Sequence, residues 1–131
     1  MRRSDQRRAA VVALYQHDVT GRPLDELVDA RAPTFTRELI DGVIRHRREI
    51  DALIGEHAEG WTLERIAPLE RNILRVAVYE LLYRDDVPLE VAIDEAVEQA
   101  TRYCSAEAPA FVNGVLAGIA RARGLVPGGS Q

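Results

Sequence analysis

Apolar residues recur along most of the chain at the three- and four-residue spacing of amphipathic helices. In the stretch from residue 69 to residue 82 they cover more than one side of a helical wheel, which predicts a helix enclosed by its neighbours. These apolar positions are Leu69, Ile73, Leu74, Val76, Ala77, Val78, Leu81 and Leu82. Pro88 then suits the first turn of a second helix, which extends to Ala100 with small apolar residues on one face. We expect this buried hairpin to form the core.

Periodic stretches on both sides of the hairpin predict four further helices. Their ranges are 4–19, 24–29, 35–57 and 109–123. Thr34 follows a break at Ala32–Pro33 and is a candidate N-cap for the helix over 35–57. These elements predict an all-α fold.

The helices are expected to form a single domain over residues 1–131, with one helical group in residues 1–60 and another in residues 61–124 around a shared core. The last residues, 125–131, combine turn-forming residues with no periodicity, so we expect a frayed tail.

Small residues recur every four positions along the last predicted helix, at Ala110, Gly114, Gly118 and Ala122. Glycine inside a helix costs roughly 1 kcal/mol relative to alanine, so a compensating contact is expected. We favour tight packing of this side within the domain over a groove for a partner.

Composition supports packed helices: apolar residues make up 47% of the chain and aromatic residues only 5%, so the core consists mostly of aliphatic side chains. The net charge is −4, yet Arg2, Arg3, Arg7 and Arg8 crowd the first eight residues against Asp5 alone. A local basic arm on an acidic body is typical of proteins that touch a polyanion with one face.

Two helices carry candidate RNA-binding side chains. Tyr15 lies two turns beyond Arg8 and is suited to stacking on an unpaired base, although it is equally compatible with packing in the core below a solvated arm. On the central helix, Arg71 and Arg75 are one turn apart. We expect Arg71 to be exposed and to face RNA, and Arg75 to form a structural ion pair with Glu70 or Glu80.

Other chemistries find little support in the sequence. The single Cys104 allows no internal disulfide, and His17, His46 and His57 are too scattered for a metal site. No Ser/His/Asp set and no glycine-rich phosphate loop is present, so we expect neither an enzyme nor a cofactor. Without a membrane-length apolar run or a secretion signal, the protein is expected to be cytoplasmic.

Three blocks in the right order resemble the NusB family of bacterial transcription antitermination factors. The blocks are RRAAVVALYQ at residues 7–16, LERNILRVAVYELLYRDDVPLEVAIDEAVEQA at residues 69–100 and FVNGVL at residues 111–116. The resemblance implies two three-helix bundles sharing one core. It also implies binding to boxA, a short single-stranded element of nascent RNA, as a heterodimer with NusE, which is a small-subunit ribosomal protein. With other Nus factors on RNA polymerase, such complexes suppress termination, notably in ribosomal RNA operons.

The same resemblance assigns roles to residues of this chain. Arg8 departs from the family pattern, in which an acidic residue often stands at this position, and we include it because it makes the arm more basic. The expected RNA contacts are then Arg2, Arg3, Arg7, Arg8, Tyr15, Glu70, Arg71, Arg75, Phe111 and Asn113. Acidic residues of the second hairpin helix and beyond are expected to face NusE: Glu90, Asp94, Glu98 and Glu107.

Two other functions remain open from the sequence. One is a protein–protein adaptor that forms a homodimer and masks its RNA face. The other is the similar RNA-recognition domain of some ribosomal RNA methyltransferases, which would require a missing catalytic domain.

Overall fold

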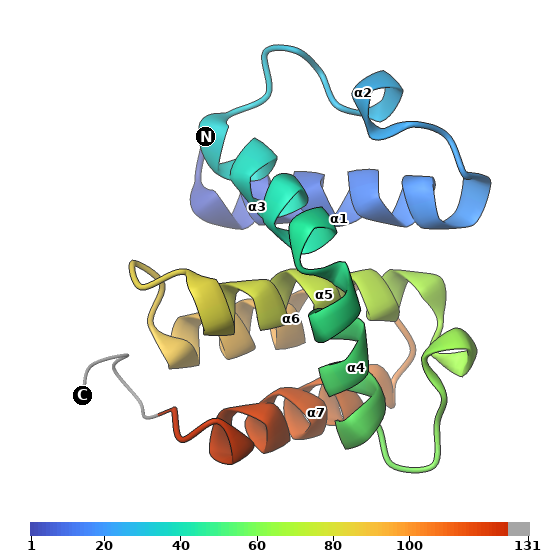
Figure 1. The fold of residues 1–131 in the computed structure, drawn as a ribbon, viewed down its shortest axis with the longest axis vertical. Helices are drawn as coiled ribbons and strands as arrows, with labels where there is room; N and C mark the ends of the chain where they lie inside the picture. Colours follow the sequence, from blue (N-terminus) through green and yellow to red (C-terminus); the bar gives the residue numbers. More distant parts are fainter. Residues whose placement is uncertain (126–131) are drawn as a thin grey trace.

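The structure, a computed structural model, describes residues 1–125, and these form seven α-helices and one 3₁₀ helix (Figure 1). The elements are α1 (Arg3–Thr20), α2 (Leu24–Leu27), α3 (Thr34–Arg45), α4 (Arg47–His57), η1 (Leu63–Arg65), α5 (Pro68–Tyr83), α6 (Leu89–Tyr103) and α7 (Ala108–Ala122). The all-α prediction is therefore confirmed. Of the tail expected to be frayed, only Leu125 lies within the described residues. None of the helices described is both long and apolar enough to span a membrane.

Helix α5 lies in the middle of the molecule, with α1 and α3 on one side and α4, α6 and α7 on the other (Figure 1). Its residues from Asn72 to Val78 are all buried, including Leu74 and Val78 with no exposed surface. The expectation of an enclosed helix at this position is correct. Burying aliphatic side chains all round one helix gives a single apolar core that both helical groups share.

The prediction of one long helix over residues 35–57 is wrong, because the chain forms two helices there, α3 and α4, with a break at His46. Apolar residues keep their helical spacing across the break, so the pattern carried no signal of it. After His46 the chain turns, and α4 packs against α5 and α7 (Figure 1). The packing therefore places α4 with the later helices, not with the group expected over residues 1–60.

Two local predictions at helix α3 and helix α7 are also corrected. Thr34 is the first residue of α3 and Pro33 precedes it as N-cap, without a capping side-chain hydrogen bond.

On α7, Ala110, Gly114 and Ala122 are exposed, so the prediction that this side of the helix packs tightly inside the domain is wrong for these three residues. Only Gly118 meets a neighbour, since a β-carbon there would lie 3.0 Å from Cδ2 of His57.

Candidate nucleic-acid interface

Arg7 is buried, and its guanidinium is paired with Glu80 of α5 in the interior. Nε of Arg7 donates to both carboxylate oxygens of Glu80, at 3.0 and 2.9 Å, and the two side chains are 4% and 1% exposed. Burial raises the pKa of Glu80 to about 6, against the opposing effect of Arg7. A phosphate cannot reach this guanidinium, so the expectation that Arg7 contacts RNA is corrected: Arg7 holds α1 on α5.

Arg75 is buried as well, and the interpretation of it as a structural residue holds. Its partners are not Glu70 or Glu80 but Asp18 of α1, 3.0 Å from Nη1, and Asp51 of α4, 2.8 Å from Nε. The chain separations of these pairs, 57 and 24 residues, explain why sequence spacing did not identify them.

Arg71 is corrected from an exposed residue to a mostly covered one, with 13% of its side chain exposed. It donates to Asp18 at 2.9 Å and to the carbonyl oxygens of Leu63 and Ile66. Arg71 thus ties the start of α5 to the end of α1 and to η1, and it does not present a free guanidinium.

Replacing Asp18 by asparagine should lower the free energy of unfolding by about 2 kcal/mol at neutral pH, because two covered arginines lose a charged partner. Burial opposes ionisation of Asp18, but hydrogen bonds from Asn72 and Arg71 and the charge of Arg75 outweigh it and lower its pKa. The stabilisation from a lowered pKa is present above the unfolded pKa and is lost as pH falls through the folded one. Urea unfolding at pH 7 and pH 3 should therefore show a smaller difference between variant and wild type at pH 3; an equal difference would contradict this account.

The first two arginines also differ in their surroundings. Arg3 pairs with Asp86 at 2.8 Å, and its Cζ lies 4.1 Å from the ring centroid of Phe35. Arg2 stays exposed, with Asp5 at 3.6 Å. Because α1 and α5 run antiparallel, Arg3 and Arg71 lie at opposite ends of this helix pair. The N-terminal arginines and Arg71 therefore do not share one face.

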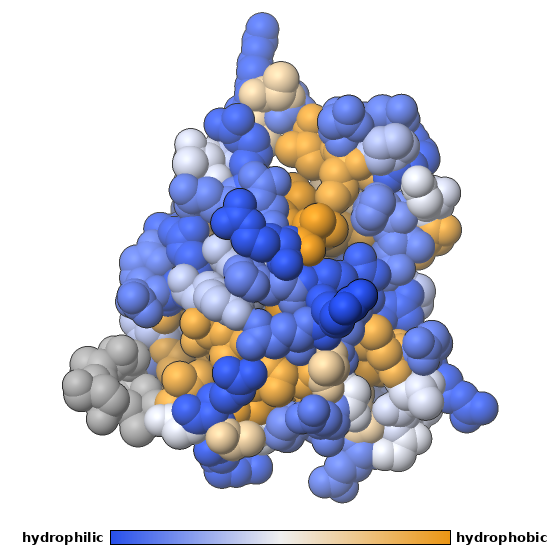
Figure 2. All heavy atoms as spheres, viewed as in Figure 1, coloured by the Kyte–Doolittle hydropathy of each residue, from blue (hydrophilic) through white to orange (hydrophobic). Residues whose placement is uncertain are grey.

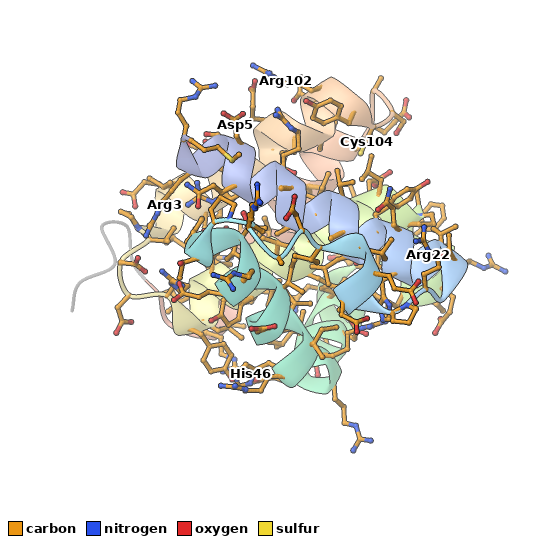
Figure 3. The ribbon with its side chains drawn as sticks, turned by 90° about the horizontal axis from the view of Figure 1, so that it is seen from above. Arg3, Asp5, Arg22, His46, Arg102 and Cys104 are labelled. Atoms are coloured by element: carbon orange, nitrogen blue, oxygen red, sulfur yellow. The ribbon has the colours of Figure 1, made fainter. Side chains whose placement is uncertain are left out.

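A hollow of about 380 Å³ between the start of α1 and the end of α6 does bring several of the expected groups together. We call it the α1/α6 hollow, and its lining comprises Arg2, Ser4, Asp5, Arg8, Asp94, Glu95, Glu98, Gln99, Arg102 and Tyr103. Arg8 is exposed and lies between Asp5, at 3.1 Å, and the hydroxyl of Tyr103, at 3.4 Å. Asp5, Arg102 and Cys104 lie on the same side of the molecule (Figure 3). Tyr15, seven residues after Arg8 and half-buried, is on the same side of α1.

A second hollow, of about 360 Å³, lies between η1, α5 and α7. We call it the α5/α7 hollow, lined by Trp61, Arg65, Ile66, Ala67, Glu70, Ser105, Glu107, Ala108 and Phe111. It unites Glu70, Phe111 and Glu107, three residues expected from the resemblance. Burial and then the charge of Glu107 raise the pKa of Glu70. Asn113 is exposed on α7 outside this lining.

Three aromatic or basic residues at these hollows were missed by the sequence reading. Tyr103 and Trp61 are 47% and 52% exposed, which is unusual for large aromatic side chains in a monomer, and Arg102 adjoins Tyr103. A tyrosine next to an arginine at the polar end of a helix was the available signal. Tyr103 in one hollow and Ser105 in the other make the two hollows neighbours along the chain.

The acidic residues expected to face NusE fall into two places. Glu90, Asp94 and Glu98 are exposed and follow one another at four-residue spacing on α6, where Glu98 pairs with Arg102 at 2.7 Å. Glu107 lies in the α5/α7 hollow.

Comparisons with known proteins agree with this architecture. A family model described as the NusB family matches residues 4–121. The chain is 54% identical over 97 residues to the transcription antitermination protein NusB of Frankia casuarinae, covering 74% of this chain and 72% of the relative. It is 45% identical over 121 residues to the protein of the same name from Geobacillus kaustophilus, covering 88% and 93%.

Solved structures show the same fold. The structure of T. maritima NusB superposes with a TM-score of 0.83 at 38% identity, covering 92% of each chain. A crystal structure of the antitermination factors NusB and NusE in complex with dsRNA gives a TM-score of 0.81 at 30% identity, covering 92% of this chain and 96% of the other. This chain belongs to the NusB family of transcription antitermination proteins.

Proposed function

We propose that this protein is an RNA-binding antitermination factor that binds boxA of nascent ribosomal RNA together with NusE and, with other Nus factors, keeps RNA polymerase transcribing. Family membership and a structural relative solved with NusE and dsRNA support the proposal. The observation that carries it is the pair Arg8–Tyr103, an exposed guanidinium and an exposed aromatic ring that lie together in the lining of the α1/α6 hollow, where Arg2 and Arg102 are exposed as well.

In this mechanism the α1/α6 hollow holds the RNA strand. Arg2, Arg8 and Arg102 neutralise phosphates, and each neutralised phosphate adds roughly 0.7 to the salt slope of the binding constant. Tyr103, with Tyr15 on the same side of α1, offers rings on which unpaired bases stack. Arg7, Arg71 and Arg75 act indirectly, since their buried ion pairs fix α1 against α5.

The α5/α7 hollow is better suited to a protein partner. Its lining has one arginine, Arg65, against three in the α1/α6 hollow, and burial together with the charge of Glu107 raises the pKa of Glu70, so a further positive charge placed here would be favourable. A basic side chain of NusE would supply this charge, between the exposed ring of Trp61 and Phe111. We therefore assign Glu70 to the partner and keep Phe111 and Asn113 as proposed RNA contacts at the edge.

The test is a titration of boxA RNA against a scrambled RNA of equal length, each with and without NusE. We expect boxA to bind at least about tenfold more tightly than the scrambled RNA, with a larger difference when NusE is present. Equal affinities for the two RNAs under both conditions would overturn the proposal.

Variants of the exposed pair separate charge from stacking. Arg8→Gln should weaken boxA binding and reduce the salt slope by about 0.7. Tyr103→Leu should weaken binding by about 1–3 kcal/mol with an unchanged slope, because stacking is lost and charge is not. The matched control is Arg22→Gln, an exposed arginine at the other end of α1. If the control changes the slope as much as Arg8→Gln does, the α1/α6 hollow is not the RNA site.

A further inference from the structure

The break between α3 and α4 brings a run of basic residues, Arg45 to Arg48, to the surface. Arg47 pairs with Asp51 at 3.0 Å. Arg45 and Arg48 are exposed, and within residues 1–125 no carboxylate lies at ion-pair distance from either. Most arginines of the described residues have a carboxylate partner, and Arg45 and Arg48 are two without one that lie beside the same joint.

Carboxylates near this joint are already engaged. Asp51 accepts from Arg75 as well as from Arg47. Glu49 accepts from the hydroxyl of Tyr83 and from Arg123, at 3.2 Å. Asp41, exposed one turn before Arg45 on α3, is the remaining acidic neighbour along the chain. The joint therefore carries a local excess of positive charge on a chain whose net charge is −4.

Stacked rings accompany this charge. His46, the residue at the break, lies with its ring centroid 3.9 Å from that of Tyr83, at an interplanar angle of 15°, and Tyr79 continues the stack. Tyr83 is 41% exposed. An exposed ring beside free guanidinium groups is the combination that holds single-stranded nucleic acid, whereas an acidic protein would need the charge alone. RNA is therefore the favoured ligand.

The joint lies away from the α1/α6 hollow, since His46 and Arg102 are on opposite sides of the molecule (Figure 3). On the face that includes the α3–α4 joint, a hydrophilic band separates two hydrophobic areas (Figure 2). One short RNA element bound in the hollow cannot also cover the joint.

We propose that the joint formed by Arg45, His46, Arg48 and Tyr83 is a second RNA-contacting surface, which binds the transcript flanking boxA through its backbone and bases without reading sequence. This inference rests on the proposed function, because boxA binding brings the flanking strand to the protein. A protein with a radius of gyration of roughly 14 Å is small enough for a flanking strand to pass around it.

The test compares minimal boxA RNA with boxA extended on both sides by unstructured oligouridine. Wild type should bind the extended RNA roughly three- to tenfold more tightly. The double variant Arg45→Gln/Arg48→Gln should lose this gain and reduce the salt slope for the extended RNA by about 1.4, while binding minimal boxA as wild type does. Tyr83→Leu should reduce the gain without changing the slope.

The charge-matched control is Arg22→Gln/Arg31→Gln, two exposed arginines outside the joint, one just after α1 and one between α2 and α3. Circular dichroism checks that every variant is folded. The proposal is overturned if wild type shows no gain from the extension, if the gain survives in the Arg45/Arg48 variant, or if the control loses it equally. It is also overturned if polyglutamate binds through Arg45 and Arg48 while the extension adds nothing, since that would indicate an acidic protein partner. Selective binding of minimal boxA tests the proposed function alone, so the two failures are distinguishable.

Discussion

Replacing Arg7 by alanine should lower the free energy of unfolding by about 3–5 kcal/mol at pH 7.5, because folding must then either bury the charge of Glu80 without its partner or protonate Glu80 far above its ordinary pKa. Urea denaturation followed by circular dichroism measures the effect. Arg8→Ala, one position along the same helix but at an exposed side chain, should change stability by less than about 0.5 kcal/mol.

The Arg7 deficit should also depend on pH in a defined direction. The folded-state pKa of Glu80 is raised to about 6, above its ordinary value of 4.5, so the stability linked to this group is fully present below about 4.5 and is lost as pH rises through 6. Without Arg7 the burial of Glu80 is unopposed and its pKa rises further. The deficit at pH 5 should therefore be smaller than at pH 7.5, and a deficit that grows on acidification would refute the account.

A double variant distinguishes a buried ion pair from a general loss of packing. Arg7→Met/Glu80→Gln removes both charges and should be more stable at pH 7.5 than Arg7→Ala alone. Folded Arg7→Met protein should keep the wild-type salt slope for boxA RNA, since Arg7 reaches no phosphate.

Gly42→Ala should destabilise the protein by about 3 kcal/mol, although alanine is normally favoured over glycine within a helix. A β-carbon at position 42 would overlap the ring of Tyr79, which lies between α3 and α5. Overpacking of a filled site typically costs about 1–3 kcal/mol, and here an aromatic ring in the His46–Tyr83 stack must move. The measurement is the midpoint and slope of urea unfolding.

Gly55→Ala is the matched control for this prediction. Gly55 is also inside a helix, α4, but is exposed and has no neighbouring atom where a β-carbon would lie. That substitution should stabilise the protein by up to about 1 kcal/mol. Gly42→Ala combined with Tyr79→Leu should recover part of the loss. If both glycine variants changed stability in the same direction, the close approach of Tyr79 to Gly42 would not be the cause.

The helices followed from the sequence because an enclosed helix needs apolar residues on more than one side, as α5 has at Ile73, Leu74 and Val76 to Val78. The break at His46 did not, because Val43 and Ile50 keep the periodic pattern on both sides of it. No local sequence pattern predicts that α4 turns towards α7. The stacking of His46 on Tyr83, 37 positions later, is a property of the folded chain only.

Only some residues of the candidate site were predicted correctly, for a similar reason. Charged residues are expected outside, and this rule holds for Arg2 and Arg8. It fails for Arg7, Arg71 and Arg75, whose carboxylate partners lie between 24 and 73 positions away. Family resemblance correctly brought Glu70 and Phe111 to one hollow, but it did not identify Tyr103, which adjoins the aligned blocks without belonging to them.

The turn at His46 has a mechanical consequence for the whole molecule. Because α4 leaves the early helices and docks between α5 and α7, a segment from the first half of the chain serves as a wall of the second. Separating the two halves of the chain would break the contacts of α4 with α5 and α7 and would expose the buried faces of both halves. The fold therefore behaves as an interlocked pair, in which loosening either half loosens its neighbour.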